Sequence, residues 1–513
     1  MNRQLPRALL IFLAGLTVAY AAYLAWFHAP YASGSDSSGY LNSARLLLSG
    51  HASAPLLVPE GLTPDIVPRE YLVPLGFRLD LTQQRILPSY PAGLPLHFAA
   101  LGILFGLGPA TTIVGVASAL AFAALLYFTS REFGVRPYWS LGVAVLGALS
   151  PLTQHYALQP MSDLVAAVWS LAVVLCALRS HRHAGWALAA GMALAVAVLV
   201  RPTNVFLLLP AAVALRPSFR TWTAFGLGGL PGALFLCLYN HSLYGAYVTT
   251  GYGDVSPLFA AKNVAITLRH YALWIPVVAS PLVLAAAALP WTGLDRRKKY
   301  TLVAWSLPIL LFYSAYECTH ETWWYLRFIL PALPALGIAA ALALQRLNYP
   351  TWYLASRLLP AGAAPELLAR GRVLSVPVIL LLGLGAAWWQ MDWTGRLRAA
   401  KIEQDERAYP LAGRWLAANL PANALLVAHQ ISGAALHYAD LPSLNPNLLT
   451  PPVAARVDKW AREHRKVMYA ALYPYEEDVV WKNLPGRWEL VTRIRVATIW
   501  RRIDSDSPPA PRP

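Results

Sequence analysis

Long apolar stretches alternate with short polar segments along most of this chain. A helix that crosses the hydrocarbon core of a bilayer needs about 20 mostly apolar residues. The pattern predicts eleven membrane spans, near residues 8–27, 110–130, 138–151, 161–178, 184–200, 203–215, 221–240, 271–290, 300–316, 327–344 and 373–391. One further apolar run, at 94–108, is shorter and flanked by prolines, which favours an interfacial or re-entrant helix.

The pattern changes from about residue 392, where charged residues become frequent. Periodicity there predicts helices at 402–420, 452–463 and 475–484, and β-strands at 424–428, 467–472 and 488–500. The expected fold class is therefore an all-α polytopic membrane bundle, residues 1–391, followed by a small α/β domain, residues 392–504. A large polar loop over 28–109 lies outside the bilayer, and the Pro-rich tail 505–513 is expected to be disordered.

Composition supports a membrane protein. Only 13% of the 513 residues are charged and 57% are hydrophobic, whereas a soluble domain carries about 25% charged residues. This excludes an ordinary cytosolic enzyme and a disordered chain. The net charge of +16 is explained better by basic cytoplasmic turns and anionic lipid than by nucleic acid, because no basic patch is interleaved with aromatic residues.

The positive charges also orient the chain. Roughly twice as many lysines and arginines fall in the short turns on one side of the eleven spans as in the longer loops on the other, and the richer side is the cytoplasmic one. This places the N-terminus inside and the C-terminal domain outside. The first span reads as a retained anchor because it is long for a cleaved signal peptide.

Two aspartates stand on the predicted outer face. Asp36 lies nine residues beyond the first span and directly before a helical pattern. Asp163 opens a later span, where a charge is unfavourable unless it is paired or functional. For each carboxylate the alternative is helix capping, in which it accepts backbone N–H bonds.

Basic and aromatic groups join the aspartates at this face. Arg201 stands between two apolar runs, and snorkelling to the interface is its alternative explanation. The segment 316–328 holds His320 and Arg327 among tyrosines and tryptophans that an interfacial aromatic belt would explain. Glu317, His320 and Glu321 are also spaced so that they could bind a metal on one helical face. Such a set suits one chemistry: a carboxylate takes the proton of an acceptor hydroxyl while cations stabilise a phosphate leaving group.

Short motifs follow one another in a distinctive order. They are Asp36-x-x-x-Tyr40 with Ala44, Leu48 and Gly50; the run from Pro88 to Leu96, which contains Tyr90; Met161-Ser162-Asp163; Arg201-Pro202-Thr203-Asn204; Tyr239-Asn240 with Tyr244-Gly245; and Arg327-Phe328-Ile329-Leu330-Pro331. With these motifs the whole chain resembles a GT-C fold membrane glycosyltransferase. It resembles in particular the bacterial relatives of protein O-mannosyltransferases and of the aminoarabinose and galacturonic acid transferases that modify lipid A and core sugars.

The resemblance implies roles for individual residues. In that family the aspartate of the first outer loop, here Asp36, is the catalytic acid/base residue. The acid of the second outer loop, here Asp163, supports it or helps to bind a divalent metal. The arginine of the late outer loop, here Arg327, approaches the donor phosphate. Many relatives have Asp-Glu at the first motif, whereas Ser37 follows Asp36 here, so a Mg²⁺ or Mn²⁺ ion on Asp36 and Asp163 is left open.

The expected activity is an inverting glycosyl transfer on the outer face of a bacterial inner (plasma) membrane. A sugar would move from a polyprenyl-phosphate donor to a hydroxyl of an envelope glycan, lipid or protein. Arg201 and His320 are expected to join Arg327 at the donor phosphate. The residues expected to contact substrate are Tyr40, Tyr90, His155 and Asn240. A transporter or flippase of lipid-linked sugars is the alternative, although such proteins favour repeated halves and polar groups near the midplane. A non-catalytic assembly scaffold is the third.

Overall fold

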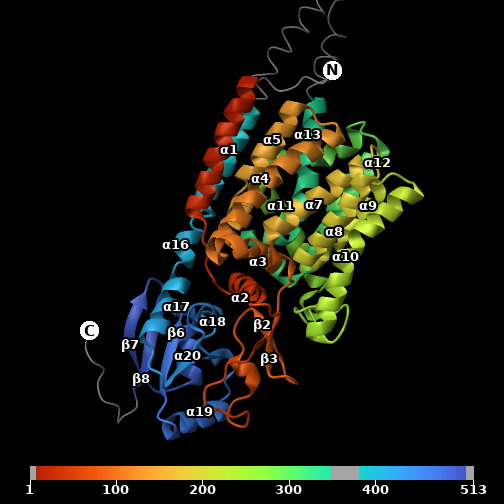
Figure 1. Cartoon of the computed structure of the whole chain (residues 1–513). Helices are drawn as coiled ribbons and strands as arrows, with labels where there is room; N and C mark the ends of the chain where they lie inside the picture. The colour runs from red at the N-terminus through yellow and green to blue at the C-terminus, as the bar shows by residue number, and fades with distance from the viewer. Residues whose placement is uncertain (1–6, 348–380, 504–513) are drawn as a thin grey trace, which may run out of the picture.

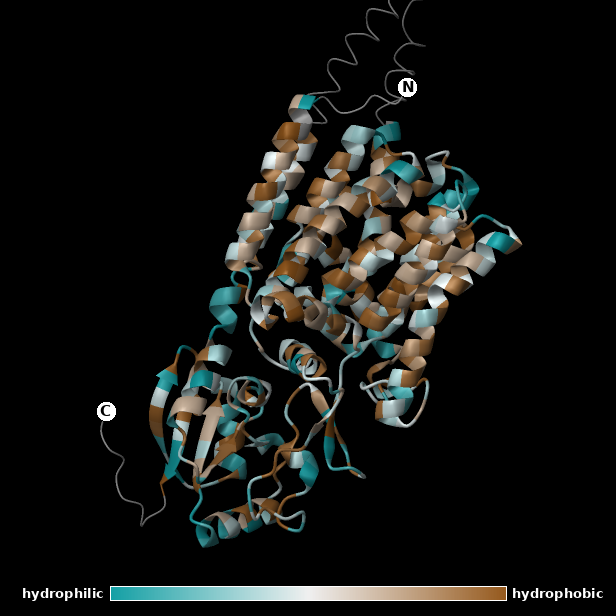
Figure 2. Ribbon diagram, in the orientation of Figure 1, coloured by the Kyte–Doolittle hydropathy of each residue, from teal (hydrophilic) through white to brown (hydrophobic). Residues whose placement is uncertain are grey.

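The computed structural model describes residues 7–347 and 381–503. It shows a bundle of long helices above an α/β unit, with helix α2 between the two (Figure 1). Hydrophobic residues dominate the bundle, whereas hydrophilic residues are frequent in the α/β unit and at the helix ends (Figure 2). The predicted tail 505–513 and the beginning of the predicted span at 373–391 lie outside the described residues.

The bundle is built from helices that match the apolar runs of the sequence, apart from a short one at 151–157, which lies in a predicted outer loop. They are α1 (Arg7–Phe27), α4 (Leu107–Phe133), α5 (Pro137–Leu149), α6 (Pro151–Ala157), α7 (Ser162–Arg179), α8 (Gly185–Val200), α9 (Leu208–Ala214), α10 (Phe219–Tyr244), α11 (Lys262–Val278), α12 (Arg296–Ser314), α13 (Leu333–Leu347) and a helix over 381–396. The 3₁₀ helices η2 (Pro202–Leu207), η4 (Pro281–Trp291), η5 (Glu317–His320) and η6 (Trp323–Ala332) connect several of them.

Within the described residues, four helices are long and apolar enough to cross a membrane: Leu107–Phe133, Ser162–Arg179, Phe219–Tyr244 and Trp323–Arg346. Shorter apolar helices stand at most of the other predicted spans. The count of eleven spans stays a prediction.

The predicted span at 271–290 is not one straight helix. Helix α11 ends at Val278, and the chain turns by 109° before η4 begins at Pro281. Buried Ser280 sits at the break with a φ of 70°, and its side chain accepts a hydrogen bond from the backbone N–H of Leu282. The pair is therefore a broken span or a re-entrant loop, a feature that a hydropathy pattern does not reveal.

The predicted interfacial run at 94–108 forms a short helix, α3 (Gly93–Phe105). Gly106, with a φ of 78°, separates it from α4. Only glycine adopts this left-handed conformation readily, so the sequence stops α3 after 13 residues. The helix lies at the end of the bundle that faces the α/β unit and packs against α2 (Figure 1).

The C-terminal segment contains a five-stranded sheet in the order β5-β4-β6-β8-β7. Its strands are β4 (Ala424–Val427), β5 (Ser443–Leu444), β6 (Val467–Leu472), β7 (Arg487–Ile494) and β8 (Ala497–Ile503). Its helices are α16 (Ile402–Glu406), α17 (Ala408–Asn419), α18 (Ser432–Ala439), α19 (Pro451–Glu463) and α20 (Glu477–Asn483). Strand β4 pairs in parallel with β5, at one edge of the sheet, and with β6, whereas β8 pairs antiparallel with β6 and β7 pairs antiparallel with β8. The strand predicted at 488–500 is in fact a hairpin, β7 and β8, turning at Arg495.

The first outer loop is part of the same body as this C-terminal segment. It forms α2 (Asp36–Leu48) and a small antiparallel sheet of β1 (Ala54–Pro55), β3 (Arg85–Pro88) and β2 (Phe77–Asp80). Side chains from both segments share one hydrophobic core: Leu62, Leu72 and Phe77 of the loop pack with Val427, Leu444 and Trp460 of the C-terminal segment. The loop and the C-terminal segment, which the sequence suggested as separate units, therefore form one extramembrane body.

Helix α2 is held on both sides. Toward the bundle it packs on α3, and toward the C-terminal segment it contacts α18. The Arg45 guanidinium donates hydrogen bonds to the carbonyl oxygens of Leu436 and His437 at the end of α18 and pairs with Asp440 at 2.8 Å. Asn42 donates from Nδ2 to the Gly433 carbonyl. Sequence reasoning missed α18, and with it the contact that fixes α2.

Candidate active site

Asp36 is the first residue of α2, but it does not cap the helix. The N-cap residue is Ser35, and neither side chain makes a capping hydrogen bond. The Asp36 carboxylate instead accepts a hydrogen bond from Nη1 of Arg327 in η6, with 2.6 Å between Oδ2 and Nη1. The capping alternative for Asp36 is therefore wrong.

A second aspartate–arginine pair lies inside the bundle. Asp163 Oδ1 is 2.6 Å from Nη2 of Arg201, which follows the last residue of α8. The N-cap of α7 is Met161 and no side chain caps that helix, so Asp163 is not a cap either. Arg201 is only 8% exposed, which contradicts snorkelling to the interface.

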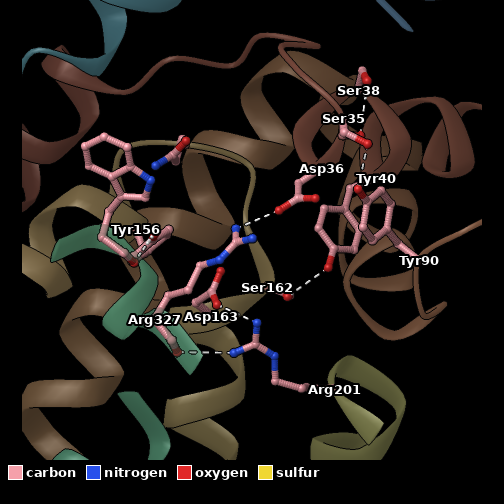
Figure 3. A network of polar contacts seen from close by, with 12 residues as sticks. Ser35, Asp36, Ser38, Tyr40, Tyr90, Tyr156, Ser162, Asp163, Arg201 and Arg327 are labelled. Atoms are coloured by element: carbon pink, nitrogen blue, oxygen red, sulfur yellow. Dashed lines mark hydrogen bonds and ion pairs between the residues drawn. The ribbon is translucent and has the colours of Figure 1, made fainter. Parts of the chain in front are cut away.

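Hydrogen bonds connect the two pairs into one network (Figure 3). Arg201 Nη1 donates to the backbone carbonyl oxygen of Arg327 at 3.2 Å. The hydroxyl of Tyr40 in α2 donates to Oγ of Ser162 in α7, the neighbour of Asp163, at 2.9 Å. The network therefore joins the extramembrane helix α2 to the bundle elements α7, α8 and η6.

Aromatic rings surround the charged groups. The Arg327 guanidinium lies 5.3 Å from the Tyr325 ring centroid and 5.0 Å from that of Phe328, and Arg201 approaches the Phe328 ring at 5.5 Å. Cations near ring faces are attracted by the ring quadrupole. No site role was predicted for Ser162 or Phe328, although each stands in a quoted motif directly beside a predicted site residue, Asp163 or Arg327.

Tyr90 completes the site on the side away from Arg327. Its hydroxyl lies 2.8 Å from Oγ of Ser35, and its ring packs against the Tyr40 ring with 4.9 Å between centroids. Asp36 stands between Arg327 and the tyrosines (Figure 3). The predicted site residues Tyr40 and Tyr90 thus both lie beside Asp36.

The surroundings of Asp36 keep it ionised. Burial alone would raise the pKa of its carboxyl group. The nearby Arg327 guanidinium and the hydrogen bonds from Tyr90 and Arg327 outweigh burial, so the pKa of Asp36 lies below that of an ordinary aspartate. At neutral pH the site therefore holds a carboxylate beside a guanidinium.

Three predicted site residues make no described contact with the two aspartates, although His155 lies near enough to Arg327 that the guanidinium adds to the lowering of its pKa by burial. His155 on α6 packs edge-on against the Tyr156 and Trp323 rings. His320 lies 3.2 Å from Oγ1 of Thr267 through its Nδ1. Asn240 near the end of α10 donates to the Tyr247 carbonyl and secures the turn that follows the helix. None of these contacts reaches Asp36 or Asp163.

The carboxylates do not form a metal-binding cluster. Over the described ranges, 7–347 and 381–503, no group of three or more His, Cys, Asp or Glu side chains is placed to hold a metal ion. The set Glu317, His320 and Glu321 therefore does not form the metal site that its spacing suggested. Asp36 and Asp163 each face an arginine guanidinium, which already supplies the positive charge that a divalent cation would bring. A Mg²⁺ or Mn²⁺ ion on Asp36 and Asp163 therefore stays a prediction, which the described residues do not support with a third acidic, His or Cys ligand.

Comparison with solved structures identifies the fold. The chain is similar to ArnT from Cupriavidus metallidurans bound to undecaprenyl phosphate, with 16% identity, a TM-score of 0.57, and coverage of 98% of this chain and 99% of that one. It is similar to the Archaeoglobus fulgidus oligosaccharyltransferase tethered with an acceptor peptide, with 12% identity, a TM-score of 0.55, and coverage of 96% and 74%. The mycobacterial arabinofuranosyltransferase AftD gives 14% identity and a TM-score of 0.50, and the match covers 98% of this chain but 42% of that longer one.

These likenesses show that the chain has the GT-C fold, as its motifs predicted. No protein-family model matches the chain, and no curated protein does.

Proposed function

We propose that this protein is an inverting glycosyltransferase that moves a sugar from a polyprenyl-phosphate donor to a hydroxyl acceptor. The observation that carries this proposal is the Asp36–Arg327 pair, where the bundle meets the extramembrane body. It combines an ionised carboxylate, which can accept a proton, with a guanidinium, which can bind a phosphate. Similarity to ArnT, solved with bound undecaprenyl phosphate, supports the choice of donor.

Asp36 is the proposed general base. Its carboxylate would accept the proton of the acceptor hydroxyl while the hydroxyl oxygen bonds to the anomeric carbon. The bond between that carbon and the phosphate oxygen would break on the opposite face, and its electron pair would leave with the phosphate. Attack from the opposite face inverts the anomeric configuration.

Arg327 is the proposed donor-phosphate ligand. A bound phosphate would compete with Asp36 for the guanidinium, and the positive charge would offset the negative charge that develops on the leaving phosphate. Arg201, held by Asp163, would help to position Arg327, since Arg201 donates a hydrogen bond to the Arg327 backbone carbonyl oxygen. His155, His320 and Asn240 have no role in this mechanism, and no step in it uses a metal.

The proposal includes an orientation. The excess of positive charge in the short turns supports an N-terminus inside and an extramembrane body on the outer face of a bacterial inner membrane. The acceptor would then be an envelope component.

A first experiment identifies the donor and tests for transfer. The full chain is purified in detergent, and co-purifying lipids are examined by mass spectrometry for a polyprenyl-phosphate sugar. The identified donor, carrying an isotopic label, is then incubated with the protein and an envelope extract. The proposal expects a labelled product whose anomeric configuration is opposite to that of the donor.

Two outcomes would replace this proposal. Translocation of the lipid-linked sugar across vesicle membranes, without a covalent product, would establish a flippase. Full biological function in a variant that lacks both Asp36 and Asp163 would point to a scaffold.

A further inference from the structure

A pocket of about 450 Å³ opens beside the Asp36 site, in the extramembrane body. It lies between β2 and the loop before it, the loop after α10, and the C-terminal segment. The side chains that the argument uses are Ser35, Glu70, Arg78, Tyr90, Tyr252 and Asn445. Its volume falls within the roughly 300–1,000 Å³ that small-molecule sites occupy.

The pocket meets the site at a tyrosine hydroxyl. Ser35 Oγ and the Tyr90 hydroxyl, which line the pocket, are hydrogen-bonded at 2.8 Å; Ser35 directly precedes Asp36, and the Tyr90 ring packs against that of Tyr40. Arg327 binds the Asp36 carboxylate from the other side (Figure 3). A molecule in the pocket and a phosphate at Arg327 would therefore lie on opposite sides of Asp36. This placement is compatible with inversion, which requires the acceptor oxygen and the leaving phosphate to lie on opposite faces of the anomeric carbon.

The polar groups of the pocket suit a ligand rich in hydroxyls. The exposed Glu70 carboxylate has no hydrogen-bond or ion-pair partner within the described part of the chain, so its acceptor oxygens are free. Arg78, also in the lining, donates from Nη1 to the Thr250 carbonyl oxygen at 3.4 Å and lies over the Tyr244 ring, so its other guanidinium N–H groups are the ones that a ligand could use. Asn445 uses its side-chain oxygen to accept the Asn447 N–H, which leaves its NH₂ group available. A hydroxyl is both donor and acceptor, so it can use both kinds of partner.

Aromatic side chains supply a flat apolar wall. The Tyr252 ring is 43% exposed and meets the Tyr90 ring edge-on at 5.9 Å. The loop that carries Tyr252 can approach the end of β3 closely because residue 251 is a glycine: a Cβ at this position would overlap the Pro88 carbonyl oxygen. The C–H face of a sugar ring is apolar and can pack on such a wall while its hydroxyls reach the polar groups.

We propose that this pocket binds the acceptor, and that the acceptor group is a sugar ring. This inference rests on the proposed glycosyl transfer and names the substrate that the transfer uses. The ring can belong to a free glycan or to the headgroup of a glycolipid, because the recognising chemistry is the same. A compact pocket lined by a carboxylate and a guanidinium suits a ring better than an extended peptide, which would be expected to pair along the free edge of β2.

The test uses the full chain and the labelled donor identified above. Envelope extract is separated into lipid-free glycan, glycolipid and protein fractions, and each is offered as acceptor. Label is expected on the glycan or the glycolipid fraction, and the fraction that receives it tells the two sources apart. Label found on protein alone would overturn the inference while leaving the glycosyl transfer intact.

Pocket variants provide the second readout. Glu70→Gln and Arg78→Gln are expected to raise KM for the accepting fraction by about tenfold or more, with KM for the donor changed less than about threefold. Glu60→Gln is the matched control, because Glu60 is also an exposed glutamate of the outer loop but does not line the pocket. Unchanged acceptor KM in both pocket variants would overturn the inference. If the unmodified protein neither transfers nor hydrolyses the donor, the proposed function itself fails.

Discussion

Two aspartate–arginine pairs of equal length lie in different surroundings. In both the shortest N–O distance is 2.6 Å. The Asp163 side chain is 1% exposed and that of Arg201 10%, whereas the values are 25% for Asp36 and 16% for Arg327. The Asp163–Arg201 pair is enclosed by the bundle, whereas the Asp36–Arg327 pair lies where the bundle meets the extramembrane body.

This difference in exposure suggests different roles for the two pairs: one supports the site and the other reacts. Removing one partner of a buried pair leaves an uncompensated charge, so such a pair resists any exchange of partners. A more accessible pair can open when a phosphate arrives. The resemblance implied that Asp36 is the acid/base residue and that Asp163 supports it or helps to bind a metal. We now propose that Asp36 reacts and that Asp163 positions Arg201 and, through it, Arg327.

The largest effect on turnover is expected for Asp36→Asn. Losing a general base typically lowers the rate by about 10²- to 10⁴-fold, and kcat for sugar transfer should fall by that amount. The melting temperature should hardly change, because the amide can still accept a hydrogen bond from Arg327. Transfer assays and thermal unfolding check both points, and Asp65→Asn, an exposed aspartate of the same loop, is the control. Near-normal turnover in Asp36→Asn would remove Asp36 from the mechanism.

Asp163→Asn should act mainly on stability. It leaves the Arg201 charge buried without its partner, which lowers the free energy of unfolding by about 3–5 kcal/mol. A thiol-reactive dye can follow unfolding, because the three free cysteines are only partly exposed. The double variant Asp163→Asn with Arg201→Met should recover part of the loss. A normally stable Asp163→Asn protein with turnover reduced a hundredfold would instead make Asp163 catalytic.

A smaller effect is expected where α18 holds α2. Arg45→Ala removes hydrogen bonds to the Leu436 and His437 carbonyl groups and the pair with Asp440. The expected loss is about 1–3 kcal/mol of stability, with kcat reduced roughly three- to tenfold because α2 carries Asp36. Arg398→Ala removes a surface pair of 2.6 Å with Asp405 and serves as control. Equal kcat values in the two variants would show that α18 does not position Asp36.

The smallest effect is expected from metal removal. Since guanidinium groups already face both carboxylates, EDTA should leave the transfer rate within about twofold of its starting value. Added Mg²⁺ or Mn²⁺ provides the comparison. Loss of transfer with EDTA, restored by one of these ions, would mean that a cation displaces an arginine when substrate binds.

The sequence predicted the fold class. It did not predict which arginine pairs with each aspartate. Apolar runs place the bundle helices, and alternation places β4 and β6, because these patterns depend on local burial. The ion pairs join residues far apart in the chain: Asp36 with Arg327, and Asp163 with Arg201. Charge alone gave no reason to choose these pairings, and His320, equally polar and nearby in sequence, points to Thr267 instead.

The extramembrane body was harder to foresee. Helix α18 is only eight residues long and rich in alanine and glycine, so it gives a weak periodic signal. The core that it helps to form depends on apolar residues of the outer loop such as Leu62 and Leu72, which are scattered among prolines and polar residues. Tertiary packing, which no local pattern records, brings these segments together.

In the proposed mechanism Arg327 keeps Asp36 ionised so that it can act as a base, and the pH profile of transfer reports on this role. A lowered pKa means that the carboxylate persists as the pH falls, so acid-side activity is lost only below the lowered pKa. The unmodified protein should keep kcat/KM flat from about pH 7.5 to about pH 5. In Arg327→Gln, burial is no longer opposed by that guanidinium, the pKa of Asp36 rises, and the fall should begin at higher pH. If kcat/KM fell over the same acidic pH range in both proteins, Arg327 would not be what keeps Asp36 ionised.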